Sequence, residues 1–105
     1  MDTKRLTIED VFLNKVKVPF MGYQSTFDFG KYVVSIVGGH KGLYGDFKTT
    51  FEVAIIENNT GVFVTKLFCG GGADVLGHQS VESVESILNI FTGAPSPKKQ
   101  GGGVD

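Results

Sequence analysis

The chain has 105 residues, of which 41% are hydrophobic and 20% are charged. This length suits one domain, and the composition is too apolar for an intrinsically disordered chain. Ten Lys and Arg residues face eleven Asp and Glu residues, which gives a formal net charge of −1. Proteins that bind nucleic acid usually carry a basic excess that contacts phosphates, so we expect no direct nucleic-acid binding.

The cysteine content and the N-terminal residues indicate whether disulfides can form and where in the cell the protein is expected. Cys69 is the only cysteine, which excludes an intrachain disulfide and a cysteine-rich metal site. We expect it to be a small, buried or half-buried apolar residue at the end of a strand. The first residues, MDTKRLTIED, hold no apolar run of signal-peptide length, and no segment has the roughly 18 apolar residues of a membrane span. We therefore expect a cytoplasmic protein that does not enter a membrane.

A short helix is predicted at residues 7–15. Thr7 is a suitable N-cap, and Asp10 three residues later completes an acidic variant of the capping box. Pro19 prevents continuation of the helix and favours an extended segment at residues 16–20. A short additional strand is one alternative for that segment. The apolar residues of the helix share one face at helical spacing: Ile8, Val11 and Phe12.

Residues 26–37 are predicted to form the first long strand. Phe27 and Phe29 share one parity, whereas Tyr32, Val34 and Ile36 have the other. A regular strand cannot point both sets at one core, because a one-residue shift reverses the face. We therefore expect a bulge or bend at Gly30 and Lys31 that brings both sets to the same side.

Two further strands are predicted at residues 46–57 and 62–68. The first of them alternates between apolar and polar residues and has the clearest period-2 pattern in the chain. Residues 57–61 contain two Asn and one Gly, which favours a tight turn. The segment 62–68 is apolar on both parities, as in a strand that is covered on both faces.

A second helix is predicted at residues 80–92, with Ser80 as N-cap and Gly93 just after its end. The remaining segment, 94–105, reads APSPKKQGGGVD, and its Gly and Pro content predicts a disordered tail. Residues 1–93 should then form a single domain.

The predicted fold class is α+β. A short N-terminal helix precedes a three-stranded, or with residues 16–20 four-stranded, antiparallel meander sheet, and a C-terminal helix packs on one face of that sheet.

The loop between the first two predicted long strands is the strongest candidate for a binding site. Residues 38–45 contain four glycines, and the tip offers side chains suited to a partner: His40, Lys41, Leu43 and Tyr44. Binding residues concentrate on loops that a rigid scaffold holds, and an apolar pair at a hairpin tip has little reason to face water. The same loop could instead bind a small ligand or nucleotide, although a phosphate loop normally joins a strand to a helix.

Catalytic and metal-binding patterns are weak in this sequence. Cys69 and His78 are two ligands, and His40 is a third in principle, which is the minimum for a zinc site. No nucleophile, base and orienting group are grouped along the chain, and no acidic pair lies in an apolar context. We therefore expect no enzymatic activity, no metal site and no cofactor.

Two resemblances to known families bear on function. The order helix–strands–helix resembles double-stranded RNA-binding domains, but those open their second helix with a Lys-rich motif, and here the stretch reads SVESVE. The run YVVSIVGGHKGLYGDFKTTFEVAI, followed by GVFVTKLF, looks like small accessory proteins of tailed bacteriophages and is similar to phage inhibitors of host defence, anti-CRISPR proteins among them. That resemblance implies a non-enzymatic protein in the host cytoplasm that binds and inhibits or modulates a host or defence protein. The sequence leaves open whether the chain forms a homodimer.

Overall fold

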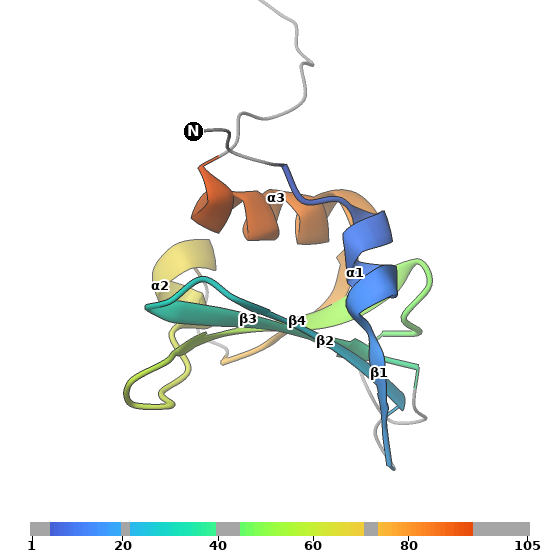
Figure 1. Ribbon diagram of the computed structural model, residues 1–105, viewed down its shortest axis with the longest axis horizontal. Helices are drawn as coiled ribbons and strands as arrows, with labels where there is room; N and C mark the ends of the chain where they lie inside the picture. The colour runs from blue at the N-terminus through green and yellow to red at the C-terminus, as the bar shows by residue number, and fades with distance from the viewer. Residues whose placement is uncertain (1–4, 20–21, 40–44, 71–73, 94–105) are drawn as a thin grey trace, which may run out of the picture.

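The computed structural model describes residues 5–19, 22–39, 45–70 and 74–93. The described elements follow one another along the chain as α1 (Ile8–Asn14), β1 (Val16–Val18), β2 (Gly22–Asp28), β3 (Tyr32–Gly38), β4 (Thr50–Glu57), α2 (Thr65–Cys69), β5 (Leu76–Ser80) and α3 (Val81–Thr92). The strands form one five-stranded antiparallel sheet in the order β1-β2-β3-β4-β5. Helices α1 and α3 lie over one face of this sheet (Figure 1). The α+β class is confirmed, with five strands in place of the three or four predicted.

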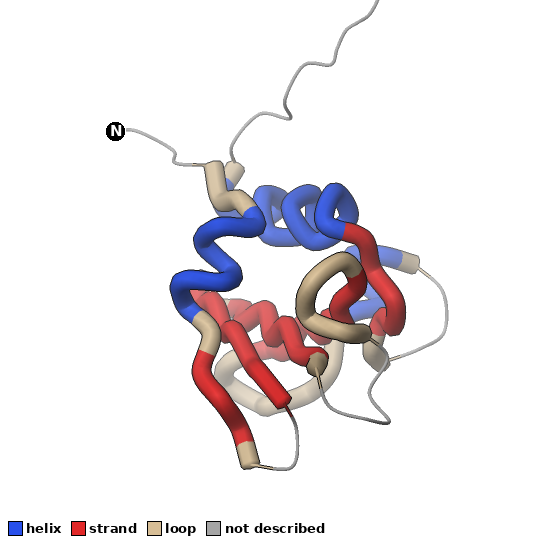
Figure 2. The backbone as a smooth tube through the Cα atoms, turned by 90° about the vertical axis from the view of Figure 1, so that its right-hand side faces the viewer, coloured by secondary structure: helices blue, strands red, loops and turns tan. Residues whose placement is uncertain are grey.

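Both predicted helices form, and local signals explain their starts and ends. The backbone N–H of Thr7 donates to Asp10 Oδ2 at 2.8 Å, which completes the expected capping box. Ser80 Oγ accepts from the Ser83 N–H at 3.1 Å, and Gly93 ends α3 with a φ of 74°. Figure 2 shows α1 over one edge of the sheet, continuing directly into β1.

The prediction of one bulged strand over residues 26–37 is wrong, because the chain reverses there. Gly30 has a φ of +90°, and its N–H donates to Asp28 Oδ1 at 2.8 Å. The Phe29 N–H donates to the Tyr32 carbonyl oxygen at 2.8 Å and closes a hairpin between β2 and β3. Phe27 then lies opposite Val34. The change of parity at Gly30 therefore marks a turn between two strands that share a face.

The strand predicted at residues 46–57 begins only at Thr50. Asp46 holds the preceding residues in a turn, because its Oδ1 accepts from the N–H groups of Lys48, Thr49 and Thr50 at 2.8, 2.9 and 3.0 Å. Phe47 has a φ of 57° in this turn and still places its ring in the core. The turn over residues 57–61 forms as expected, with the Gly61 N–H donating to the Glu57 carbonyl oxygen at 2.8 Å.

The strand predicted at residues 62–68 is also wrong. Only Phe63 makes a bridge with β4, opposite Ile56, and the chain then turns into α2. The Ile55 N–H, which a neighbouring strand would otherwise bind, donates to Thr65 Oγ1 at 2.8 Å. The second partner of β4, besides β3, is β5, a segment for which no strand was predicted.

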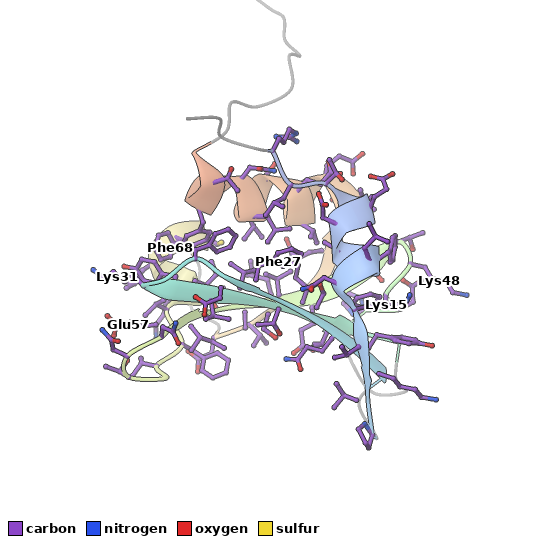
Figure 3. All side chains as sticks on the ribbon, in the orientation of Figure 1. Lys15, Phe27, Lys31, Lys48, Glu57 and Phe68 are labelled. Carbon is purple, nitrogen blue, oxygen red and sulfur yellow. The ribbon has the colours of Figure 1, made fainter. Side chains whose placement is uncertain are left out.

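The core lies between the sheet and the two longer helices, and Phe27 and Phe68 point into this layer in Figure 3. Its buried residues come from α1, β3, β4, α3 and the turn before β4: Val11, Val34, Ile36, Phe47, Phe51, Val53, Ile55, Val84, Ile87 and Leu88. Among the described residues, no helix is long and apolar enough to cross a membrane. Residues 94–105, predicted to be a disordered tail, lie outside the described residues.

Candidate functional site

The tip of the glycine-rich hairpin, with His40, Lys41, Leu43 and Tyr44, lies outside the described residues. Its base is described. The Gly39 N–H donates to the Gly45 carbonyl oxygen at 3.1 Å, which joins the two sides of the loop directly below the tip. The loop connects the antiparallel strands β3 and β4, and this differs from the strand-to-helix geometry of a phosphate loop.

Close packing fixes the base of this hairpin. A Cβ atom at Gly45 would lie 2.7 Å from Phe51 Cα and 2.8 Å from the Thr50 carbonyl oxygen, so only glycine fits there. The ring of Phe47 packs against three other aromatic rings, with centroid distances of 5.3 to 5.9 Å: Phe12, Tyr23 and Phe51. The residues that carry the tip are therefore held by the core.

The carboxylate of Asp46 is the strongest electrostatic feature of this base. The backbone N–H groups of Thr50, Thr49 and Lys48 hold the pKa of the Asp46 carboxyl well below its usual range. Asp46 therefore stays ionised well into acid and keeps the turn closed.

The face of the sheet that lies opposite α1 and α3 contains a hollow. Val34 and Ile36 point into the core, so the alternate residues of β3 point to this second face, opposite Glu52, Ala54 and Ile56 of β4. The hollow has a volume of about 260 Å³. We call it the open-face hollow, and it is lined by Gln24, Ser35, Val37, Glu52, Ala54, Ile56, Phe63 and Val75.

The lining of the open-face hollow is mostly apolar. Val37 and Ala54 form a buried floor, whereas Phe63 at its rim is 41% exposed. Among the described residues of the lining, Glu52 is the only charged one. The Gln24 side chain is held over the sheet by its Nε2, which donates to Ser35 Oγ at 2.9 Å. This arrangement can accept an apolar side chain from outside, with polar groups at its margin.

Sequence reasoning missed this hollow, although one signal pointed to it. Apolar residues on both parities of 62–68 were interpreted as a strand covered on both faces. In the structure, Val64 and Phe68 pack against the core, whereas Val62, Phe63 and Leu67 are exposed. Leu67 is 76% exposed and does not line the hollow.

A second depression lies between α1 and β2. It has a volume of about 390 Å³. We call it the edge groove, and it is lined by Leu6, Asp10, Leu13, Asn14, Thr26, Phe27 and Asp28.

Cys69 and His78 do not form a metal centre with other described residues. Cys69 is half-buried as expected, but it ends α2 where a strand was predicted, and burial raises the pKa of its thiol. His78 lies in β5 with a φ of 54°. Within residues 5–19, 22–39, 45–70 and 74–93, no three His, Cys, Asp or Glu side chains are placed to hold one metal ion. His40 lies outside these ranges.

Comparison of the chain with protein families, curated proteins and solved structures found no match.

Proposed function

We propose that this chain is a non-enzymatic interaction protein that binds a protein partner through the open-face hollow and through the tip of the glycine-rich hairpin. The observation that carries the proposal is the hollow itself. An exposed aromatic ring, Phe63, borders a buried aliphatic floor on a sheet face that α1 and α3 leave uncovered (Figure 1). Exposed apolar surface of this kind is typical of partner-binding sites.

An apolar side chain of the partner is the occupant that fits. Among the described residues, five of the eight that line the hollow are apolar: Val37, Ala54, Ile56, Phe63 and Val75. Phe63 offers a ring edge that loses water on contact. Aromatic residues at the margin of a pocket often contribute a large share of binding energy. Gln24 and Ser35 supply hydrogen-bonding groups that would orient the partner.

Two observations support including the hairpin tip in the proposal: the sequence pattern of the tip and the packing of the hairpin base. Gly45, Asp46 and Phe47 hold that base against the core, so a partner that contacts the tip meets residues carried by a rigid support. Leu43 and Tyr44 would then provide an apolar anchor, and Lys41 would add electrostatic steering.

The resemblance of the strand pattern to phage anti-defence proteins makes a bacterial defence protein the first partner to test. Cells that carry a CRISPR system directed at a phage are challenged with that phage while they express the chain. Inhibition of the system by the chain would raise the number of plaques. The component of the CRISPR system that co-purifies with the chain is then isolated, and its affinity for the chain is measured by calorimetry.

Two variants separate the open-face hollow from general surface effects. Phe63→Ala should weaken binding by about 2 kcal/mol, as truncation of an aromatic hot spot does. Leu67→Ala removes a more exposed apolar side chain outside the hollow and should leave the affinity unchanged. Equal binding by wild type and Phe63→Ala would contradict the site. A rise in melting temperature with nucleotides, in the absence of a protein partner, would instead favour the small-ligand alternative.

A further inference from the structure

The outer edge of β2 is covered by β1 along only part of its length. β1 pairs with Gly22, Tyr23 and Gln24, whereas β3 pairs with β2 as far as Asp28. Within the part of the chain that the structure describes, no strand continues β1 alongside Thr26 and Asp28. The edge groove lies at this uncovered stretch, with α1 as its other wall.

The backbone groups of Thr26 and Asp28 point toward this groove. Asn14 Nδ2 donates to the Thr26 carbonyl oxygen at 2.7 Å from the α1 side. Backbone groups alternate in direction along an antiparallel strand, so those of Asp28 point the same way as those of Thr26, and those of Phe27 point toward β3. The Asn14 amide therefore occupies a position that a donor of an added strand would take.

The side chains of the groove favour a cationic and partly aliphatic occupant. Among the described residues that line it, Asp10 and Asp28 are the only charged ones. Each binds neighbouring groups through one carboxylate oxygen: Asp10 through Oδ2 to Thr7, and Asp28 through Oδ1 to Gly30 and Asn58. Leu13, with an exposed fraction of 85%, lies on the helix wall of the same groove.

We propose that the edge groove binds a short extended segment of a protein partner, which adds to the outer edge of β2 and carries a lysine or arginine next to an aliphatic residue. The Thr26 N–H and the Asp28 backbone groups would bond to the added segment, and a donor of that segment would replace the Asn14 amide at the Thr26 carbonyl oxygen, as in other cases of strand addition. The two carboxylates would bind its cationic side chain, and Leu13 would cover its aliphatic one. This surface is distinct from the open-face hollow, and the proposal does not depend on the function proposed above.

A fluorescent heptapeptide that alternates arginine and valine is a suitable probe, with a heptapeptide that alternates glutamate and valine as its control. The arginine peptide should bind the full chain, and the glutamate peptide should not. Hydrogen exchange followed by NMR should show slower exchange of the Thr26 and Asp28 amides when the arginine peptide is present. Protection confined to the edge of β1 or β5 would overturn the proposal.

Three variants test the groove itself. Asp28→Asn keeps the acceptor for Gly30 but removes the charge, and should weaken peptide binding by about tenfold. Thr26→Pro removes an N–H that faces the groove and takes no part in pairing with β3, so it should abolish binding while the sheet persists. Leu13→Arg places a positive charge on the helix wall of the groove, which disfavours a cationic occupant and leaves the backbone hydrogen-bonding groups unchanged. It should also weaken peptide binding by about tenfold.

Other outcomes decide against the proposal. Binding of the arginine peptide that survives Leu13→Arg and Asp28→Asn would place it elsewhere on the molecule. Self-association of the chain that Thr26→Pro removes would assign the groove to a second copy in place of a partner. Phe63→Ala, which tests the open-face hollow, should leave peptide binding unchanged, so failure of either proposal is seen separately.

Discussion

Asn89 holds Leu6 with two hydrogen bonds that imitate a pair of strands. Its Oδ1 accepts from the Leu6 N–H at 2.9 Å, and its Nδ2 donates to the Leu6 carbonyl oxygen at 2.8 Å. The two residues are 83 positions apart, so one side chain ties the start of the domain to its last helix. Glu85 lies one turn earlier and accepts from the Ile8 N–H at 2.9 Å, which adds a second tie.

The first prediction follows from this tie. Asn89 is 7% exposed, and Asn89→Ala leaves the Leu6 backbone groups without their partner. The free energy of unfolding should fall by about 3 kcal/mol, because the variant loses several hydrogen bonds and leaves part-buried polar groups unpaired. Denaturant unfolding measures the change. Ser86→Ala, at an exposed position of the same helix, is the control and should change stability by less than about 0.5 kcal/mol.

Thr65 is the second point at which one side chain replaces a strand neighbour. Its Oγ1 accepts from the Ile55 N–H at 2.8 Å and donates to the Asp74 carbonyl oxygen at 2.6 Å, and the side chain is fully buried. Thr65→Val keeps the shape of the side chain but leaves the Ile55 N–H without an acceptor. We expect this to lower the free energy of unfolding by about 2 kcal/mol. Thr65→Ser keeps the hydroxyl and should lose clearly less. Equal losses in the two variants would assign the effect to packing.

Gly45 and Gly61 offer a matched pair of glycine substitutions. Gly45→Ala would place a Cβ within 2.8 Å of β4 backbone atoms, so the base of the hairpin must shift, at a cost of about 2 kcal/mol. Gly61→Ala meets no atom within 4 Å, and its φ of +73° leaves only backbone strain of about 1 kcal/mol. Thermal unfolding of both variants compares the two effects. A larger loss at Gly61 would show that the base of the hairpin tolerates a methyl group.

The Asp46 turn predicts a dependence of stability on pH. Its folded-state pKa lies below the unfolded value, so its contribution is fully present above that unfolded value, about 4, and is lost as the pH falls toward the folded pKa. Asp46→Asn keeps an acceptor but no charge. It should therefore be less stable than wild type at pH 7, and the difference should shrink as the pH falls below about 4. A constant difference from pH 7 to pH 2 would contradict the role of the charge.

The sequence by itself determined the two longer helices, because their signals are local. A capping box at Thr7 and Asp10 acts within one turn, and the same holds for Ser80 at the start of α3 and Gly93 at its end. The apolar stripe of Ile8, Val11 and Phe12 also identified the face of α1 that packs on the core. Phe51 lies at the centre of the alternating pattern over residues 46–57, and it is fully buried, as a period-2 pattern with one apolar face predicts.

Strand partners and the surfaces described above were decided only by the tertiary structure. The parity change at Gly30 fits a bulge or a reversal equally well in sequence, and the choice depends on whether β2 can pair with both β1 and β3. The outer edge of β4 could have paired with residues 62–68. Thr65 binds Ile55 instead, and the chain leaves the sheet there and returns as β5. The edge groove and the open-face hollow each join residues from separate strands, so their existence depends on register, which the alternation of residues along a single strand does not specify.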